Sequence, residues 1–97
     1  MKFYAPAEDS FLLSETISDY LKDKKLTNLK VLDLGTGSAI QSKNLIYLGL
    51  KKENITASDI NELALKEAEK VGVKIIKSNL FDNIKDKFDI IVFNPPY

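Results

Sequence analysis

Residues 31–38 read VLDLGTGS, an apolar strand that carries one acid, Asp33, and ends in a glycine turn. Glycines at positions 35 and 37 let the backbone turn sharply and come close to a ligand. A helical stretch is predicted at 39–48, so its N-terminus would point at that ligand. Position 40 is isoleucine, which excludes the G-x-G-x-x-G dinucleotide fingerprint. A tight strand-to-helix turn without any ligand is the alternative interpretation.

The rest of the chain alternates helices and strands, the pattern of an α/β protein. Strands are predicted at 30–34, 54–58, 73–77 and 88–93, and helices at 6–21, 39–48 and 62–71. Right-handed crossovers place the first three strands side by side, and a switch back places the fourth beside the first. The predicted sheet is therefore parallel with the order 3-2-1-4. Ligands bind at such a switch point, at the carboxyl ends of the strands.

Composition narrows the classes of function. The chain has 97 residues, which fits one domain, 1–97, and its formal net charge is zero. All of its basic residues are lysine, and the lack of arginine and of net positive charge makes nucleic acid an unfavourable partner. Without cysteine or histidine, zinc sites built on these residues and Ser-His-Asp or Cys-His catalysis are excluded, and no metal is expected.

Targeting signals are missing from the sequence as well. Its start lacks the apolar segment of a signal peptide, and no run approaches the roughly 18 apolar residues of a membrane span. We therefore expect a cytoplasmic protein without a membrane partner.

Two acids at the ends of predicted strands are candidates for ligand binding. Asp33 would be costly to bury unpaired, so we expect it to bind either a ligand ammonium or backbone amides of the turn. Asp59 lies at the end of the second predicted strand, 22 residues beyond Gly37. An acid at about this distance accepts hydrogen bonds from ribose hydroxyls. An acid at the N-terminus of the following helix is the alternative interpretation of Asp59.

Residues after the third and fourth predicted strands complete the candidate site. Asn79 and Leu80 lie where an adenine ring could rest; the alternative is a polar loop residue followed by a core leucine. Residues 94–97 read NPPY directly after the apolar fourth strand. The Asn94 side-chain oxygen and the Pro95 carbonyl could accept the two N–H groups of an amide or aromatic amine, and Tyr97 could pack on the planar group.

Taken together, DLGTGS at 33–38, Asp59, Asn79-Leu80 and NPPY at 94–97 resemble the successive motifs of class I methyltransferases of the HemK/PrmC type. That family methylates the glutamine of the GGQ motif in translation release factors. The opening YAPAEDSF at 4–11 is similar to the archaeal and eukaryotic branch. The resemblance covers nearly the whole chain and implies a Rossmann-like fold with a leading helix, here its N-terminal half.

The resemblance also implies roles for single residues. S-Adenosylmethionine would be the cofactor, with its methionine portion near Ser10, Asp33 and Gly35. Asp59 would bind the ribose, Asn79 and Leu80 the adenine, and Asn94 the target amide. There are two departures from the family pattern. Ala39 stands where relatives usually have glycine, and Asn79 replaces a common aspartate.

The substrate and the partners follow from the same resemblance. A release factor is the expected substrate, with a small activator subunit as a further partner. The alternatives are a nucleic-acid adenine or cytosine N-methyltransferase and a cofactor-binding subunit that is inactive alone. The family core continues beyond NPPY, so we expect a second polypeptide that carries the C-terminal half. The 88–93 strand would otherwise present an open apolar edge. Self-association through that edge is the lesser alternative.

Overall fold

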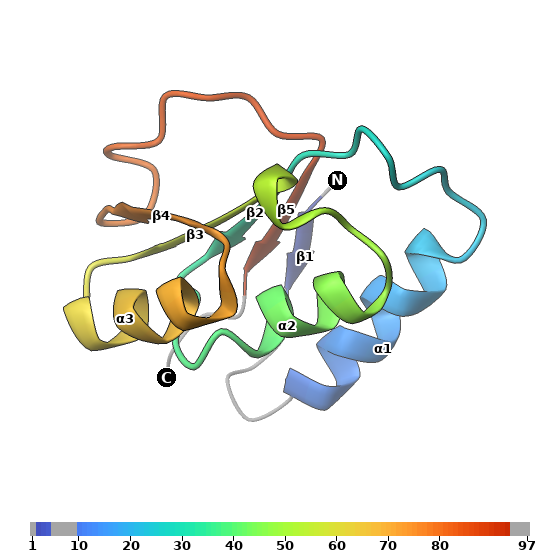
Figure 1. The fold of residues 1–97 in the computed structure, drawn as a ribbon, viewed down its shortest axis with the longest axis horizontal. Coiled ribbons are helices and arrows are strands. Elements are labelled where there is room, and N and C mark those ends of the chain that lie inside the picture. Colours follow the sequence, from blue (N-terminus) through green and yellow to red (C-terminus); the bar gives the residue numbers. More distant parts are fainter. Residues whose placement is uncertain (1, 5–9, 94–97) are drawn as a thin grey trace.

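The computed structural model describes residues 2–4 and 10–93, which form a parallel five-stranded sheet with helices packed on one face (Figure 1). Along the chain the elements are β1 Lys2–Tyr4, α1 Ser10–Leu21, β2 Val31–Leu34, α2 Ile40–Tyr47, the 3-10 helix η2 Lys52–Asn54, β3 Ile55–Asp59, α3 Glu62–Val71, β4 Lys74–Lys77 and β5 Ile90–Phe93. The strands lie in the order β1-β5-β2-β3-β4, and every pairing is parallel.

The predicted order 3-2-1-4 is confirmed, since the four expected strands are β4, β3, β2 and β5 in that sequence across the sheet. Their bounds agree to within two residues. Of the predicted leading helix, residues 6–9 lie outside the described part of the chain. The sheet is therefore Rossmann-like, with its switch point between β2 and β5.

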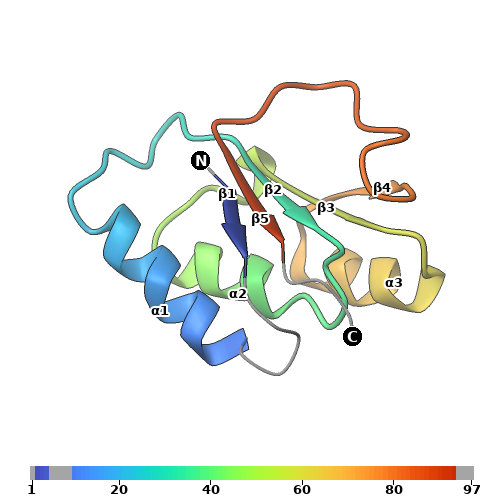
Figure 2. The ribbon, with the colours of Figure 1, turned by 180° about the vertical axis from the view of Figure 1, so that it is seen from behind.

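The edge of β5 is where the prediction was wrong. Sequence reasoning left that edge open, but β1 pairs with it in parallel, with Lys2 opposite Ile91 and Tyr4 opposite Phe93 (Figure 2). The backbone groups of β5 thus have partner strands on both sides, β1 and β2. Self-association through an unpaired β5 edge, as formulated from the sequence, does not fit this arrangement.

Local sequence explains the best-defined helix, α3. The Asn61 side chain accepts a hydrogen bond from the amide of Leu63 at 2.8 Å, which caps the helix start. Gly72 ends it in the left-handed conformation, with φ of 97°, where a side chain would be strained. Both signals were read correctly from the sequence, and the helix has the predicted bounds.

The core lies between the sheet and the three helices. Leu13, Ile17 and Leu21, spaced four residues apart on α1, are all buried, as their periodicity predicts. They share one apolar cluster with residues of the central strands, including Val31 and Val92.

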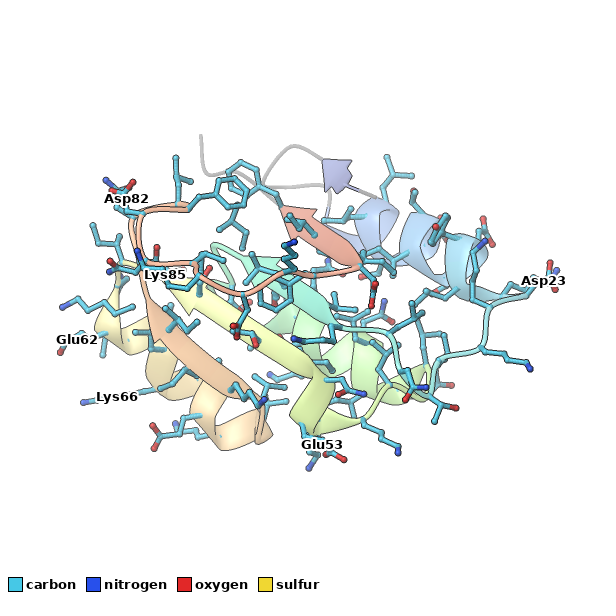
Figure 3. All side chains as sticks on the ribbon, turned by 90° about the horizontal axis from the view of Figure 1, so that it is seen from above. Asp23, Glu53, Glu62, Lys66, Asp82 and Lys85 are labelled. Carbon is cyan, nitrogen blue, oxygen red and sulfur yellow. The ribbon has the colours of Figure 1, made fainter. Side chains whose placement is uncertain are left out.

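The opposite face of the sheet is covered differently. Leu32 and Leu34 of β2 are fully buried but do not belong to the helix-side cluster, because alternate residues of a strand face opposite sides. The connection between β4 and β5, residues 78–89, lies on the side of the sheet away from the helices (Figures 1 and 2). Seen from above, its Asp82 and Lys85 lie toward the same end of the molecule as Glu62 and Lys66 of α3, far from Asp23 (Figure 3). We call residues 78–89 the β4–β5 connection.

Among the helices of the described residues, none is long and apolar enough to cross a membrane.

Candidate cofactor site

The glycine turn, residues 35–39, follows β2 and carries unusual backbone angles. Gly35 and Gly37 have φ of 67° and 56°, in the left-handed region that glycine enters without strain. Ala39, which precedes α2, also has a positive φ, 64°. Its Cβ makes that conformation unfavourable by roughly 1–2 kcal/mol. The turn therefore carries backbone strain at Ala39 that a glycine at this position would avoid.

Asp33 is the buried anchor of this turn. Its Oδ2 accepts hydrogen bonds from the Thr36 hydroxyl at 2.8 Å, the Ser42 hydroxyl at 2.7 Å and the Ser42 amide at 3.1 Å. The carboxylate therefore joins the end of β2, the glycine turn and the first turn of α2. Asp33 is thus an internal hydrogen-bond acceptor, but the expected donors were wrong: it binds two hydroxyls and the Ser42 amide of α2, and no amide of the turn.

The charge of Asp33 is held in an unfavourable environment. Burial raises the pKa of its carboxyl above the ordinary value, the hydrogen bonds from Ser42 and Thr36 lower it, and the negative charge of Asp59 raises it further. Within the described residues, every hydrogen bond to this side chain goes to Oδ2. Asp33 also lines the cavity described below. Its other oxygen, Oδ1, accepts no hydrogen bond from the described residues.

Asp59 is the second acid that anchors the glycine turn. Its Oδ2 accepts from the Gly37 amide at 3.0 Å, and its Oδ1 accepts from the Asn61 amide at 2.9 Å. The Thr36 amide also donates to the carbonyl of Ser58, at 2.8 Å. Asp59 thus fixes the glycine turn to the start of α3. A carboxylate has about four acceptor positions, so two remain for a ligand.

The β4–β5 connection provides a further wall of the site. The Ser78 hydroxyl donates to the carbonyl of Leu80 at 2.7 Å and accepts from the Asn83 amide at 3.0 Å, which closes a tight local turn. Leu80 has a positive φ of 54° and a side chain that is 53% exposed. The interpretation of Leu80 as a buried core leucine is therefore wrong.

These segments enclose a cavity of about 460 Å³ at the carboxyl ends of the strands. This volume lies within the range of about 300–1,000 Å³ that small-molecule sites occupy. The sequence-predicted residues Asp33, Gly35, Gly37, Asp59, Asn79 and Leu80 all line it. Residues that sequence reasoning gave no role line it too: Thr36, Ser38, Ile40, Gln41, Ile60, Ser78 and Phe93.

Two of the lining residues that were not predicted, Ile60 and Phe93, could have been found from their positions in the sequence. Ile60 directly follows the predicted acid Asp59, and Phe93 directly precedes NPPY. A Cβ on Gly35 would lie 3.6 Å from the Phe93 ring, an ordinary van der Waals contact, so the ring leaves room for a side chain and the positive φ is what favours glycine. Gln41, in contrast, had no signal in the sequence, because its direction depends on how α2 is rotated.

The remaining predicted site residues are only partly described. Ser10 is the first residue of α1. Asn94, Pro95 and Tyr97 lie outside the described residues, directly after β5. In the part of the chain that is described, no group of three or more acids clusters as a metal site would.

The fold is a Rossmann-like domain with a cavity at the carboxyl ends of its strands. Comparison with known proteins specifies the family. The family model described as "Methyltransferase small domain" matches residues 10–97, so the chain belongs to that family.

Individual relatives agree with the family resemblance read from the motifs. A Methanocaldococcus jannaschii protein named as a candidate N5-glutamine methyltransferase is 39% identical, over 97% of this chain and 47% of its own length. The release factor glutamine methyltransferase of Lactococcus lactis is 38% identical, over 86% of this chain and 33% of its own length. The chain spans a third to a half of these relatives.

A solved structure confirms the fold. Protein 1320 of Thermoplasma acidophilum superposes with a TM-score of 0.71 at 29% identity, over 91% of this chain and 47% of that protein.

Proposed function

We propose that this chain is the cofactor-binding part of a methyltransferase that transfers a methyl group from S-adenosylmethionine to a planar nitrogen. The favoured substrate is the side-chain amide of a glutamine in a translation release factor. The observation that carries the proposal is the cavity in which Asp33, Asp59 and Leu80 come together at the switch point of the sheet. The names of the relatives add the substrate class.

The residues of the cavity fit this cofactor chemically. Asp33 offers a buried negative charge whose Oδ1 accepts no hydrogen bond from the described residues, which suits an ammonium group. Asp59 has acceptor positions left for ribose hydroxyls after binding two backbone amides. Leu80 and Ile60 are exposed apolar side chains at the cavity, which suit the faces of a purine ring.

The substrate side of the proposal rests on NPPY. The Asn94 side-chain oxygen and the Pro95 carbonyl would hold the two N–H groups of the target amide, and Tyr97 would pack on its plane. When bound, S-adenosylmethionine supplies a methyl group that its sulfonium charge has already activated. The chain's own task is to orient the target nitrogen at the mouth of the cavity, which β5 reaches through Phe93.

A partner completes the proposal. Because the chain spans a third to a half of its relatives, we propose that residues equivalent to their remaining length, supplied by a second polypeptide, build the rest of the substrate surface. Helices cover one face of the sheet, whereas the β4–β5 connection alone lies on the other among the described elements (Figure 1). Parallel sheets normally have both faces covered, so the side of the connection is the natural place for such a partner.

Calorimetric titration of the chain with S-adenosylhomocysteine tests cofactor binding. We expect saturable one-to-one binding, with NADH as the control ligand. Tight binding of NADH, with no binding heat on addition of S-adenosylhomocysteine, would contradict the proposal.

The transfer itself is tested by isotope-labelled methyl incorporation into a release factor, with structured RNA as the competing substrate, in the presence and absence of the partner chain. Asn94→Ala should abolish incorporation and leave cofactor affinity nearly unchanged, since Asn94 would touch the substrate alone. Methylation of RNA in place of the release factor would support the nucleic-acid alternative.

A further inference from the structure

The strand β1 occupies a place in the sheet that a later strand holds in a complete doubly wound fold. The strands β4, β3, β2 and β5 follow the order 3-2-1-4, and a doubly wound sheet continues this order with a fifth strand beside the fourth. Here β1, the first strand of the chain, lies in that fifth place, parallel to β5 (Figure 2). A fifth strand from a partner would therefore compete with β1 for the same edge of β5.

The two strands differ in how firmly they belong to the sheet. β5 is an interior strand, and its residues Ile90 and Val92 are buried in the helix-side cluster. β1 has three residues, fewer than any other described strand, and among the described strands it pairs with β5 alone. Very short edge strands are poor templates for the addition of a further strand. A partner strand thus gains more contact by pairing with β5 directly than by adding outside β1.

The face of β5 away from the helices is incompletely covered. Ile91 lies opposite Leu32 of β2, so both side chains point to that face. Leu32 is 0% exposed, whereas Ile91 is only partly buried. In a doubly wound sheet, the crossover that leads to the fifth strand runs over this face. A partner that supplied the strand together with its crossover helix would complete the cover over Ile91.

The opposite edge of the sheet is a less suitable place for this strand. β4 begins and ends with a lysine, Lys74 and Lys77. Charged side chains on an edge strand, lysine above all, oppose pairing with another strand. The order 3-2-1-4-5-6 also places the added strands next to β5 and none beyond β4.

We propose that the edge of β5 is the docking site for a parallel strand of the partner polypeptide, and that β1 leaves this edge when the partner binds. In the absence of the partner, β1 shields β5 from pairing with other chains. The inference rests on the proposed function and deepens it, because it states where the partner joins the sheet and which strand it replaces.

A pair of cysteines across β1 and β5 reports whether β1 leaves. The chain has no cysteine, so Lys2→Cys/Ile91→Cys places its only two thiols on residues that lie opposite each other. Neighbouring strands are about 4.8 Å apart, which is within the Cα separations that a disulfide spans. The probe for the partner is the part of the Methanocaldococcus jannaschii relative that this chain does not match, co-expressed with the chain. Under mild oxidation, we expect the free chain to form the disulfide and the complex to remain reduced.

Two further variants serve as control and as independent test. Thr56→Cys/Lys74→Cys joins β3 and β4, which stay paired in the proposal, so its disulfide should form equally in the free chain and in the complex. Deletion of Lys2–Tyr4 vacates the edge of β5, so the shortened chain should bind the probe at least as tightly as the wild type. If the partner paired with the outer edge of β1 instead, the deletion would abolish the complex.

Four results would overturn the inference. They are equal disulfide formation across β1 and β5 in the free chain and in the complex, no such disulfide in the free chain, loss of the complex on deletion of Lys2–Tyr4, and no complex with the wild type. Calorimetry with S-adenosylhomocysteine separates this inference from the proposed function. If the wild type binds that ligand and one of the four results is found, the inference alone fails; if it does not bind the ligand, the proposed function fails and the inference fails with it.

Discussion

The glycine turn after β2 and the β4–β5 connection line the same cavity, but they are held in place by different means. The turn is anchored by two carboxylates, Asp33 and Asp59, that accept hydrogen bonds from the turn and from neighbouring elements. The part of the connection at the cavity closes on itself through Ser78 and exposes more than half of the Leu80 side chain.

This difference separates two kinds of binding surface. In the turn, the groups that would bind a ligand also hold β2, α2 and α3 together, so the fold and the site cannot vary independently. In the connection, the apolar side chain at the cavity contributes little burial. Substitutions in the turn should therefore change both folding and binding strongly, and substitutions in the connection should have only a small effect on folding.

The largest effect is expected for Asp33→Ala. The substitution leaves three donors of Thr36 and Ser42 without their acceptor, and we expect the free energy of unfolding to fall by about 2–4 kcal/mol, measured by urea unfolding. Asp33→Asn is the matched control, since it retains one acceptor oxygen and should lose less than half as much. Equal losses in the two variants would show that the hydrogen bonds do not anchor the turn.

The same carboxylate should make stability depend on pH. Because the pKa of Asp33 is raised in the folded state, the folded protein keeps a proton that the unfolded chain loses above its ordinary value of 3.8. Its contribution to stability is then fully present below that value and is lost as the pH rises through the folded-state pKa.

Urea unfolding of the wild type and of Asp33→Asn between about pH 4 and about pH 8 measures this contribution. The stability of the variant relative to the wild type should increase as the pH rises through the folded-state pKa of Asp33 and become constant above that pKa. A relative stability that decreases with pH would mean that hydrogen bonding outweighs burial at Asp33.

Asp59→Ala should affect binding and stability together. We expect S-adenosylhomocysteine to bind about 1–3 kcal/mol more weakly, because the ribose hydroxyls lose their acceptor. The amides of Gly37 and Asn61 lose their partner as well, so the unfolding midpoint should also decrease. Calorimetry and thermal unfolding on the same sample measure both. Weaker binding with unchanged stability would show that Asp59 contacts the ligand but does not anchor the glycine turn.

The smallest effect is expected for Leu80→Ala in the connection. Because the side chain is 53% exposed, its truncation should change the free energy of unfolding by about 1 kcal/mol or less. S-Adenosylhomocysteine affinity should fall by a similar amount, since an apolar contact with the ligand is lost. Asn83→Ala, which removes a hydrogen bond of the connection away from the cavity lining, is the control for loosening of the segment. A stability loss as large as that of Asp33→Ala would remove the distinction between the two segments.

The central strands and the residues at their carboxyl ends could be predicted from the sequence, because short-range patterns encode them. The apolar run at Val31–Leu34 and the cap Asn61 are local signals, and the glycines of the turn require positive φ. Sequence reasoning missed β1, whose three residues carry no periodic pattern and become a strand through pairing with β5. Gln41 was missed for a related reason, since its orientation depends on Ser14, which is 27 residues away in sequence.

The pairing of β1 with β5 has a consequence for the order of folding. Lys2 and Ile91 are nearly the whole chain apart in sequence, so their contact closes the largest loop in the sheet and carries the greatest entropic cost of closure. The β2–β3 and β3–β4 pairs join segments that are much closer in sequence. We therefore expect β1 to dock late in folding, and the backbone amides that link it to β5 to exchange with deuterium by a local opening, at a lower free energy than those between β2 and β3.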